Sequence, residues 1–218
     1  VMEHFNKPDS EKPFIDVIKK VRRFIYAQPF PYTWAYKMVE LYNPDIPLKN
    51  SVWYDYVIKE ADYLISIAKN SLLDNFDLLK YIDDEKLHSS FESTFQSDAS
   101  LINTYADKIH SSWDEAVDYG TVKFSNLPRT TKLDEIDAVL IKKNRDLYKG
   151  IIKKIPPLFI CKEDEYVNSL RSLYPILTKL VDIVREVDKR LMEEKIERNS
   201  YTFSDTEHFA INLLFGIE

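Results

Sequence analysis

Hydrophobic residues recur at helical spacing along most of this 218-residue chain. Near the N-terminus, Phe14, Val17, Ile18, Val21, Phe24 and Ile25 follow the spacing of one face of a helix. Prolines and polar stretches separate this segment from those that follow. The pattern predicts helices at residues 13–28, 31–43, 51–73, 97–119, 133–155 and from 163 onward. It predicts short helices at 74–96 and a loop or short extended segments at 120–132.

Local signals refine these predictions. Trp34, Met38 and Leu41 are expected to point inward from the second helix, because they share one side of it. Ser97 is a plausible N-cap of a later helix, since its hydroxyl can accept a hydrogen bond from the first turn. Pro175 is expected to break or restart the last long helix, because proline lacks a backbone N–H.

The last long helix carries a narrow apolar seam with alternating spacings of four and three, which is typical of coiled-coil packing. Its members are Leu173, Leu177, Leu180, Val184, Val187 and Leu191. The rest of this helix is heavily charged, so one edge is expected to pack. If that edge is exposed, the chain could instead be a free-standing helical module that binds a protein partner.

Composition narrows the class of protein. Apolar residues make up 44% of the chain, which is enough for a substantial core. Only three glycines occur, which excludes a glycine-rich phosphate loop. The single cysteine excludes an internal disulfide framework, and no apolar run is long enough to cross a membrane. These features predict an all-α fold, an irregular multi-helix arrangement with one long helix near its C-terminus.

Charge is unevenly distributed although the chain is acidic overall, with a formal net charge of −6. Residues 121–155 hold nine Lys or Arg against four Asp or Glu. A basic cluster of this kind can contact nucleic-acid phosphates, with salt-dependent affinity, or can simply form a solvated helix face. The residues predicted to contact DNA phosphates, from charge and spacing alone, are Arg129, Lys132, Lys142, Lys143, Arg145 and Lys149. Phe124, in the same region, is a candidate for stacking on a base.

No residue constellation in the chain is typical of a self-contained enzyme. The acidic runs at 83–85 and 163–165 are not typical of a metal site, because contiguous carboxylates on a helix point in different directions. The four histidines do not show metal-ligand spacing. Cys161 has no histidine near it in sequence. We therefore expect no catalytic residue, metal site or cofactor site within these residues.

The stretch "SYTFSDTEHFAINLL", residues 200–214, combines a helix start with an apolar face. Ser204 and Glu207 fit a capping box, in which the hydroxyl and the carboxylate each accept a hydrogen bond from the other residue's backbone N–H. Phe209, Leu213 and Leu214 follow on one side. A helix from Ser204 is therefore predicted, and its apolar face is expected to lack a partner here.

The longer C-terminal sequence, "LVDIVREVDKRLMEEKIERNSYTFSDTEHFAINLL", resembles an element of the UvrD-like superfamily I DNA helicases, and in particular the AddA (RexA) subunit of the bacterial ATP-dependent helicase/nuclease. "VIKKVRRFIYAQPFPYTWAYKMVELYN" is similar to an upstream AddA stretch through Pro31 and Trp34, and "FSNLPR" to its middle region. Thr202 and Thr206 depart from the usual family phrase. The C-terminal residues that match the family motif are Phe203, Asp205, Glu207 and His208.

The resemblance implies that the chain is part of a longer subunit that unwinds and degrades double-strand DNA ends for recombinational repair. Residues 1–203 would then be the helical accessory subdomain called 1B, and residues 204–218 would return into the first motor domain. The implied partners are DNA, as a duplex end or fork, and a second AddB/RexB-like subunit; ATP and Mg²⁺ would bind elsewhere in the longer protein. The implied location is the cytoplasm.

Overall fold

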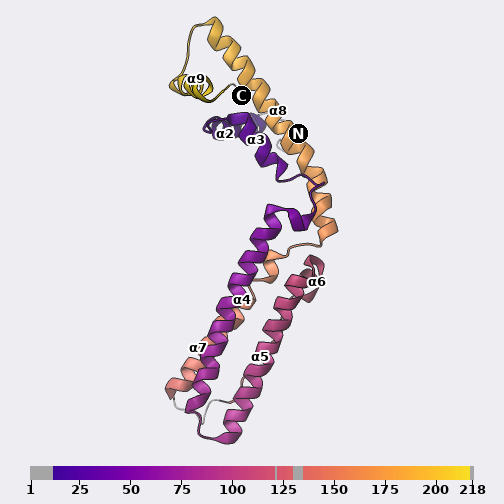
Figure 1. Cartoon of the computed structure of the whole chain (residues 1–218), viewed down its shortest axis with the longest axis vertical. Coiled ribbons are helices and arrows are strands. Elements are labelled where there is room, and N and C mark those ends of the chain that lie inside the picture. The colour runs from indigo at the N-terminus through magenta and orange to yellow at the C-terminus, as the bar shows by residue number, and fades with distance from the viewer. Residues whose placement is uncertain (1–11, 121, 130–134, 217–218) are drawn as a thin grey trace. The chain divides into compact units, whose positions relative to one another are not determined.

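The computed structural model describes residues 12–120, 122–129 and 135–216, and in these ranges it contains helices and no strand (Figure 1). The predicted all-α fold is confirmed. The helices are α2 (Lys12–Tyr26), α3 (Pro31–Glu40), α4 (Val52–Leu78), α5 (Glu85–Ser111), α6 (Trp113–Tyr119), α7 (Glu135–Ile152), α8 (Glu163–Glu197) and α9 (Phe203–Phe215), with 3-10 turns η1 (Leu48–Asn50), η2 (Leu79–Tyr81) and η3 (Pro156–Leu158).

The chain folds as two compact units. Unit 2 is the continuous stretch Pro47–Tyr166, and unit 1 combines the described residues up to Ile46 with those from Val167 onward. Both α8, apart from its first turn, and α9 lie in unit 1. The division predicted at residue 204 refers to a longer protein and stays a prediction.

Unit 2 is a bundle in which α4 packs against both α5 and α7 (Figure 1). Each helix presents a buried seam spaced four and three residues apart, as in left-handed coiled coils. The seam of α4 is Ala61, Ile65, Ala68, Leu72 and Asn75; that of α5 is Phe91, Phe95, Asp98, Ile102, Tyr105 and Ile109; that of α7 is Ile141, Arg145, Tyr148 and Ile152.

The helix boundaries in unit 2 correct the prediction for residues 74–97. The third predicted helix continues to Leu78, and one long helix, α5, begins at Glu85. Asp84 is its N-cap, because the Asp84 carboxylate accepts hydrogen bonds from the N–H groups of Lys86 and Leu87, both at 3.0 Å. Ser97 therefore lies inside α5, where its backbone N–H belongs to the helix, and it caps nothing.

Unit 1 has its own core, formed where α2 and α3 pack against the middle of α8. Phe14, Ile18 and Ile25 of α2 face this core, as their spacing predicts, whereas Phe24, which was predicted on the same face, is exposed. On α3 the buried positions are Ala35 and Val39 rather than the expected ones.

Two α3 predictions are corrected, because Met38 is exposed and Leu41 lies just beyond the helix and is half-buried. Trp34 is half-buried and packs against the core of unit 1, as predicted, with its ring 5.4 Å from that of Phe24. The small side chain of Ala35 allows close helix contact, so the inward side is set by Ala35 and not by the largest residue.

Helix α8 is continuous through Pro175, so the predicted break is absent. Leu180 and Val184 of its seam are buried in the core of unit 1, and Leu177 and Val187 pack against that core. Leu173 remains exposed. Because α2 and α3 already cover the middle of the seam, it is not available to a partner, which counts against the interaction-module alternative.

Candidate functional site

The predicted basic residues of unit 2 occupy different environments. Lys142 and Lys143 on α7 are exposed, and neither forms an ion pair within the part of the chain that the structure describes. Arg129 is also exposed, at the end of the described segment 122–129. Lys132 lies outside the described residues. The exposed cations Lys153 and Lys154 follow α7 directly.

Arg145 departs from the prediction, because it points into the bundle. Its side chain is 5% exposed and that of Asp98 is fully buried. The guanidinium donates from Nε and Nη2 to the two Asp98 oxygens, at 2.8 and 3.2 Å, and from Nη2 to the Ser125 carbonyl at 2.7 Å. Tyr148 donates a third hydrogen bond to Asp98, at 2.6 Å. Arg145 is therefore a structural residue of the core, and its Nε and Nη2 donors are bonded within the protein.

Lys149 and Phe124 form a small contact at the edge of the same bundle. The Lys149 ammonium lies 5.8 Å from the centre of the Phe124 ring, within the range of a cation–π contact. The Phe124 ring also lies 5.9 Å from that of Tyr148 and packs against the core. Phe124 thus helps fix segment 122–129 along α7, and its ring is half-buried instead of being displayed for a base.

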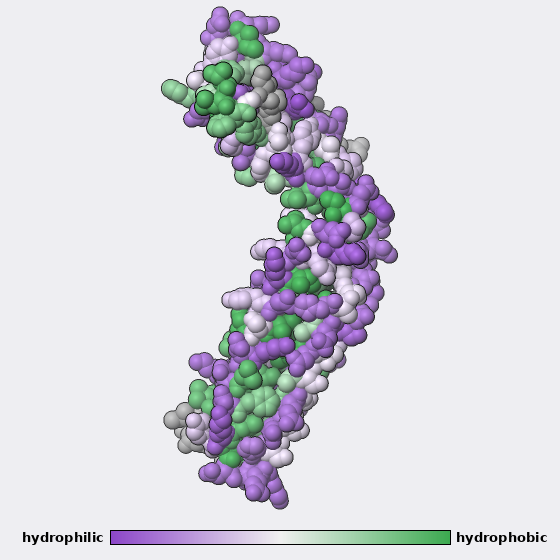
Figure 2. Space-filling model, viewed as in Figure 1, coloured by the Kyte–Doolittle hydropathy of each residue, from purple (hydrophilic) through white to green (hydrophobic). Residues whose placement is uncertain are grey.

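The motif residues at the C-terminus lie on α9 and separate into two classes. Phe203 and Glu207 are exposed, whereas Asp205 is fully buried and His208 is half-buried. Figure 2 shows hydrophobic side chains gathered on the surface at α9. Those with large exposure include Phe203, Phe209, Leu213, Leu214 and Phe215.

The N-cap of α9 is Thr202, not Ser204. The Asp205 N–H donates to the Thr202 hydroxyl oxygen at 3.3 Å, and the Thr202 N–H donates to the Asp205 carboxylate at 2.7 Å. Ser204 lies within the first turn of the helix. The capping box is real, but it lies two residues earlier than predicted.

Asp205 is also the centre of a network that joins α9 to α8 and α2. Lys195 donates to both carboxylate oxygens, at 2.8 and 2.7 Å, and the Tyr26 hydroxyl donates at 2.9 Å. Burial by itself would raise the pKa of Asp205, but the bonds from Lys195, Thr202 and Tyr26 outweigh it and hold the pKa well below its usual range. The carboxylate therefore stays ionised and anchors the start of α9.

His208 adds a second link to the same place. Its Nε2 lies 2.8 Å from the Tyr26 carbonyl oxygen, which can only accept, so this nitrogen carries the proton. The His208 and Tyr26 rings are 4.3 Å apart. Burial, followed by the bond to Asp205, raises the pKa of Tyr26, so its hydroxyl remains a donor.

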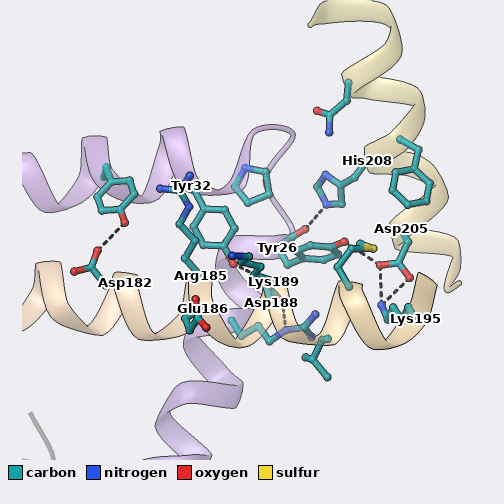
Figure 3. Close-up of a pocket in the computed structure, with 17 residues that line it drawn as sticks. Tyr26, Tyr32, Asp182, Arg185, Glu186, Asp188, Lys189, Lys195, Asp205 and His208 are labelled. Carbon is teal, nitrogen blue, oxygen red and sulfur yellow. Dashed lines mark hydrogen bonds and ion pairs between the residues drawn. The ribbon is translucent and has the colours of Figure 1, made fainter. Parts of the chain in front are cut away.

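A pocket of about 620 Å³ lies beside this network, within unit 1 (Figure 3). Its walls come from α2, α3, α8 and α9 and include the side chains of Tyr26, Tyr32, Asp188, Asp205 and His208. Its volume is in the range typical of small-molecule sites. Several of its polar wall residues are already bonded to one another, including Arg22 with Asp188 and Lys195 with Asp205.

Asp188 forms the second buried acid of the pocket. It accepts hydrogen bonds from the Arg22 guanidinium and from the Tyr32 hydroxyl. Burial, and then the bond to Asp188, raise the pKa of Tyr32, so that hydroxyl is also a donor. Sequence reasoning missed Arg22, Tyr32 and Asp188, since their partners are more than 150 positions apart in the chain.

The remaining candidates for chemistry are the histidines, the acidic residues and the cysteine. Within the described ranges, no three His, Cys, Asp or Glu side chains are grouped closely enough to hold a metal ion. Burial raises the pKa of the Cys161 thiol, which disfavours the reactive thiolate. None of the helices in the described ranges has an apolar stretch long enough to span a membrane.

Comparison with known proteins identifies homologues with one common name, although no family model matches the chain. The AddA subunit of the ATP-dependent helicase/nuclease of Clostridium botulinum (strain Langeland) is 28% identical over 205 residues, which cover 91% of this chain and 16% of that protein. The protein of the same name from Listeria monocytogenes serotype 4a is 27% identical, covering 99% of this chain and 18% of the relative. The protein of that name from Alkaliphilus oremlandii is 28% identical, covering 98% of this chain and 18% of the relative.

The resemblance to AddA inferred from the sequence is thereby confirmed: the chain is homologous to a segment of the AddA subunit of ATP-dependent helicase/nucleases. It spans 16–18% of the length of these curated relatives.

Proposed function

We propose, from this homology, that the chain is the helical accessory segment, of the 1B type, of an ATP-dependent DNA helicase and exonuclease subunit. In this role it borders the path of the DNA and contacts backbone phosphates, while ATP and Mg²⁺ bind elsewhere in the longer protein. A second subunit of the AddB/RexB kind and a cytoplasmic location are part of the same proposal. The segment itself would supply no catalytic residue.

One observation carries the DNA-contact part of the proposal: the exposed lysines of α7 extend from a packed bundle and have no ion-pair partner among the residues that the structure describes. Lys142 and Lys143 form no ion pair within the described residues. By contrast, the Lys80, Lys108 and Lys162 side chains of the same unit are each bonded to a carboxylate. Cations without a carboxylate partner keep their full attraction for phosphate.

The backing of these lysines comes from α4. The Asn75 side-chain amide donates to the Ile141 carbonyl at 3.2 Å, and the Ser71 hydroxyl donates to the Asn144 carbonyl at 3.0 Å. These bonds lie on either side of Lys142 and Lys143 in the sequence of α7. They fix the backbone from which the two lysines extend, so that side-chain ordering is the main entropy cost of phosphate contact.

The proposal is tested by titrating the chain with duplex and forked DNA at two salt concentrations. The variant Lys142→Glu/Lys143→Glu should bind more weakly, and the slope of log affinity against log salt should fall by about two, since each phosphate contact contributes about 0.9. The matched control is Lys59→Glu/Lys86→Glu, which makes the same charge change at exposed positions of α4 and α5. It should leave the slope within about half a unit of the unmodified chain's.

Two results would refute the DNA-contact assignment. One is an equal loss of affinity in the control and test variants, because it would reflect net charge alone. The other is binding that is absent or insensitive to salt both in this chain and in a longer helicase/nuclease subunit that contains it.

A further inference from the structure

The charged side chains that line the pocket in unit 1 divide into those that form ion pairs and those that do not. Its two buried acids, Asp188 and Asp205, are each paired with a buried or half-buried cation, Arg22 and Lys195 respectively. These two ion pairs therefore stabilise the pocket walls. The other lining side chains would make the contacts with a ligand.

Two further carboxylates line the pocket, and both have partners. Asp182 accepts a hydrogen bond from the Tyr36 hydroxyl at 2.8 Å. Glu186 is bonded to Arg190, with Nε at 2.8 Å from its oxygen. The two remaining lining cations, Arg185 and Lys189, are exposed on α8 and form no ion pair within the described residues. The pocket lining is therefore balanced overall, with four carboxylates and four Lys or Arg side chains, and Arg185 and Lys189 are the two of these cations that no carboxylate holds in an ion pair within the described residues.

Flat aromatic surfaces occupy the same pocket. The Arg185 guanidinium lies 5.8 Å from the centre of the Tyr32 ring, so cation and ring form one continuous edge (Figure 3). Phe209, on α9, is 45% exposed and also lines the pocket. The Asn212 amide, one helical turn from His208, adds a group that can both donate and accept.

We infer that this pocket binds a nucleotide, with its phosphate on Arg185 and Lys189 and its base against the aromatic wall of Tyr32 and Phe209. Arg185 and Lys189 together suit a phosphate, since guanidinium and ammonium groups are its usual partners. A base matches an aromatic wall with a neighbouring amide, because stacking tolerates any base and the amide can bond its edge. The volume of about 620 Å³ is adequate for one nucleotide.

The inference goes beyond the proposed function, because it concerns unit 1 and does not require α7 to contact DNA. The same chemistry could come from a free nucleotide or from an unpaired nucleotide of a DNA strand. Both carry a phosphate and an exposed base, and the arms of the test separate them.

The test is calorimetric titration of the whole chain with four probes: thymidine 5′-monophosphate, thymidine, inorganic phosphate and 5′-phosphorylated tetrathymidylate. The monophosphate should bind at least about tenfold more tightly than thymidine or phosphate alone, because only it uses both parts of the pocket. If the tetranucleotide binds more tightly than the monophosphate, the ligand is part of a DNA strand. If the two affinities are equal, the ligand is a free nucleotide.

Two sets of variants locate the site. Arg185→Ala/Lys189→Ala should weaken monophosphate binding by about tenfold or more, as should Phe209→Ala through lost stacking. The matched control Lys37→Ala/Lys179→Ala removes two exposed cations of α3 and α8 that do not line the pocket, and it should leave the affinity unchanged. The circular dichroism of each variant shows whether it remains folded.

The inference is overturned if the monophosphate does not bind at millimolar concentration, or if phosphate alone binds equally well. It is also overturned if the control variants lose as much affinity as the pocket variants. Lys142→Glu/Lys143→Glu should keep monophosphate binding, so a failure of the α7 proposal and a failure of this one give different results.

Discussion

The buried pair of Asp98 and Arg145 offers the sharpest test of how unit 2 is held together. Replacing Arg145 by methionine keeps most of the side-chain volume but removes three hydrogen bonds, two to Asp98 and one to the Ser125 carbonyl. Asp98, which has no exposed surface, would keep only the Tyr148 hydroxyl. An ionised carboxylate left in this state is uncompensated.

The expected cost of Arg145→Met is about 3–5 kcal/mol in the free energy of unfolding, the range for breaking one side of a buried ion pair. The double variant Asp98→Leu/Arg145→Met should recover about half of that cost or more, because no charge then remains buried. It should not recover everything, since the Tyr148 hydroxyl and the Ser125 carbonyl lose their partners.

The assay is urea denaturation followed by circular dichroism, with hydrogen exchange of α5 and α7 to show that unit 2 is the part that opens. Lys142→Met is the control, one turn away and exposed, and should lie within about 0.5 kcal/mol of the unmodified chain. A cost below about 1 kcal/mol for Arg145→Met would refute the reasoning. A loss of DNA affinity without loss of stability would return Arg145 to the phosphate-contact set.

Three further predictions concern unit 1. Thr202→Ala should destabilise α9 by about 1 kcal/mol, measured by urea denaturation, whereas Ser204→Ala should cost little because it is not the N-cap. The carboxyl of Asp205 has a folded pKa below its unfolded value, so its contribution to stability is present above about pH 4 and is lost as the pH falls further. Asp205→Asn should remove that part of the pH dependence in denaturation curves at pH 6 and pH 3. Leu180→Ala should cost about 2–5 kcal/mol, whereas Leu173→Ala should have little effect, and neither should change a monomer–dimer balance in sedimentation.

The helical class of the fold could be predicted because it depends on local periodicity, and most helix positions followed. The seams of unit 2 could not be recognised in the same way. On α5 the seam from Phe91 to Ile109 contains Asp98, and on α7 the seam contains Arg145. Each polar residue interrupts an apolar pattern, and only the fold reveals that the two interruptions face each other.

The seam on α8 shows that a regular apolar pattern can also extend beyond the part of a helix that is buried. Its spacing from Leu173 to Leu191 is as regular as any in the chain, yet its first member is exposed. Periodicity identifies which side of a helix can be buried. How far along the helix a partner extends is decided by other elements, in this case α2 and α3.

The misplaced cap has a similar cause. Thr202 with Asp205 and Ser204 with Glu207 both fit the spacing of a capping box, so local sequence does not decide between them. Asp205 is selected because Lys195 and Tyr26 reach it from α8 and α2. Those contacts bury the Asp205 carboxylate, and α9 therefore begins with the capping box of Thr202 and Asp205.

The same criterion separates structural charges from charges that can act on a ligand. Arg145 and Asp205 were both candidates from the sequence, and both are buried and bonded to partners of opposite charge. Lys142 and Arg185 are exposed and form no ion pair within the described residues. A charge that already has a buried partner must break that bond to meet a ligand, whereas an exposed one gives up only water. Functional tests on this chain should therefore begin with Lys142 and Arg185, and a first result in which Arg145 or Asp205 controls binding in a folded protein would contradict the criterion.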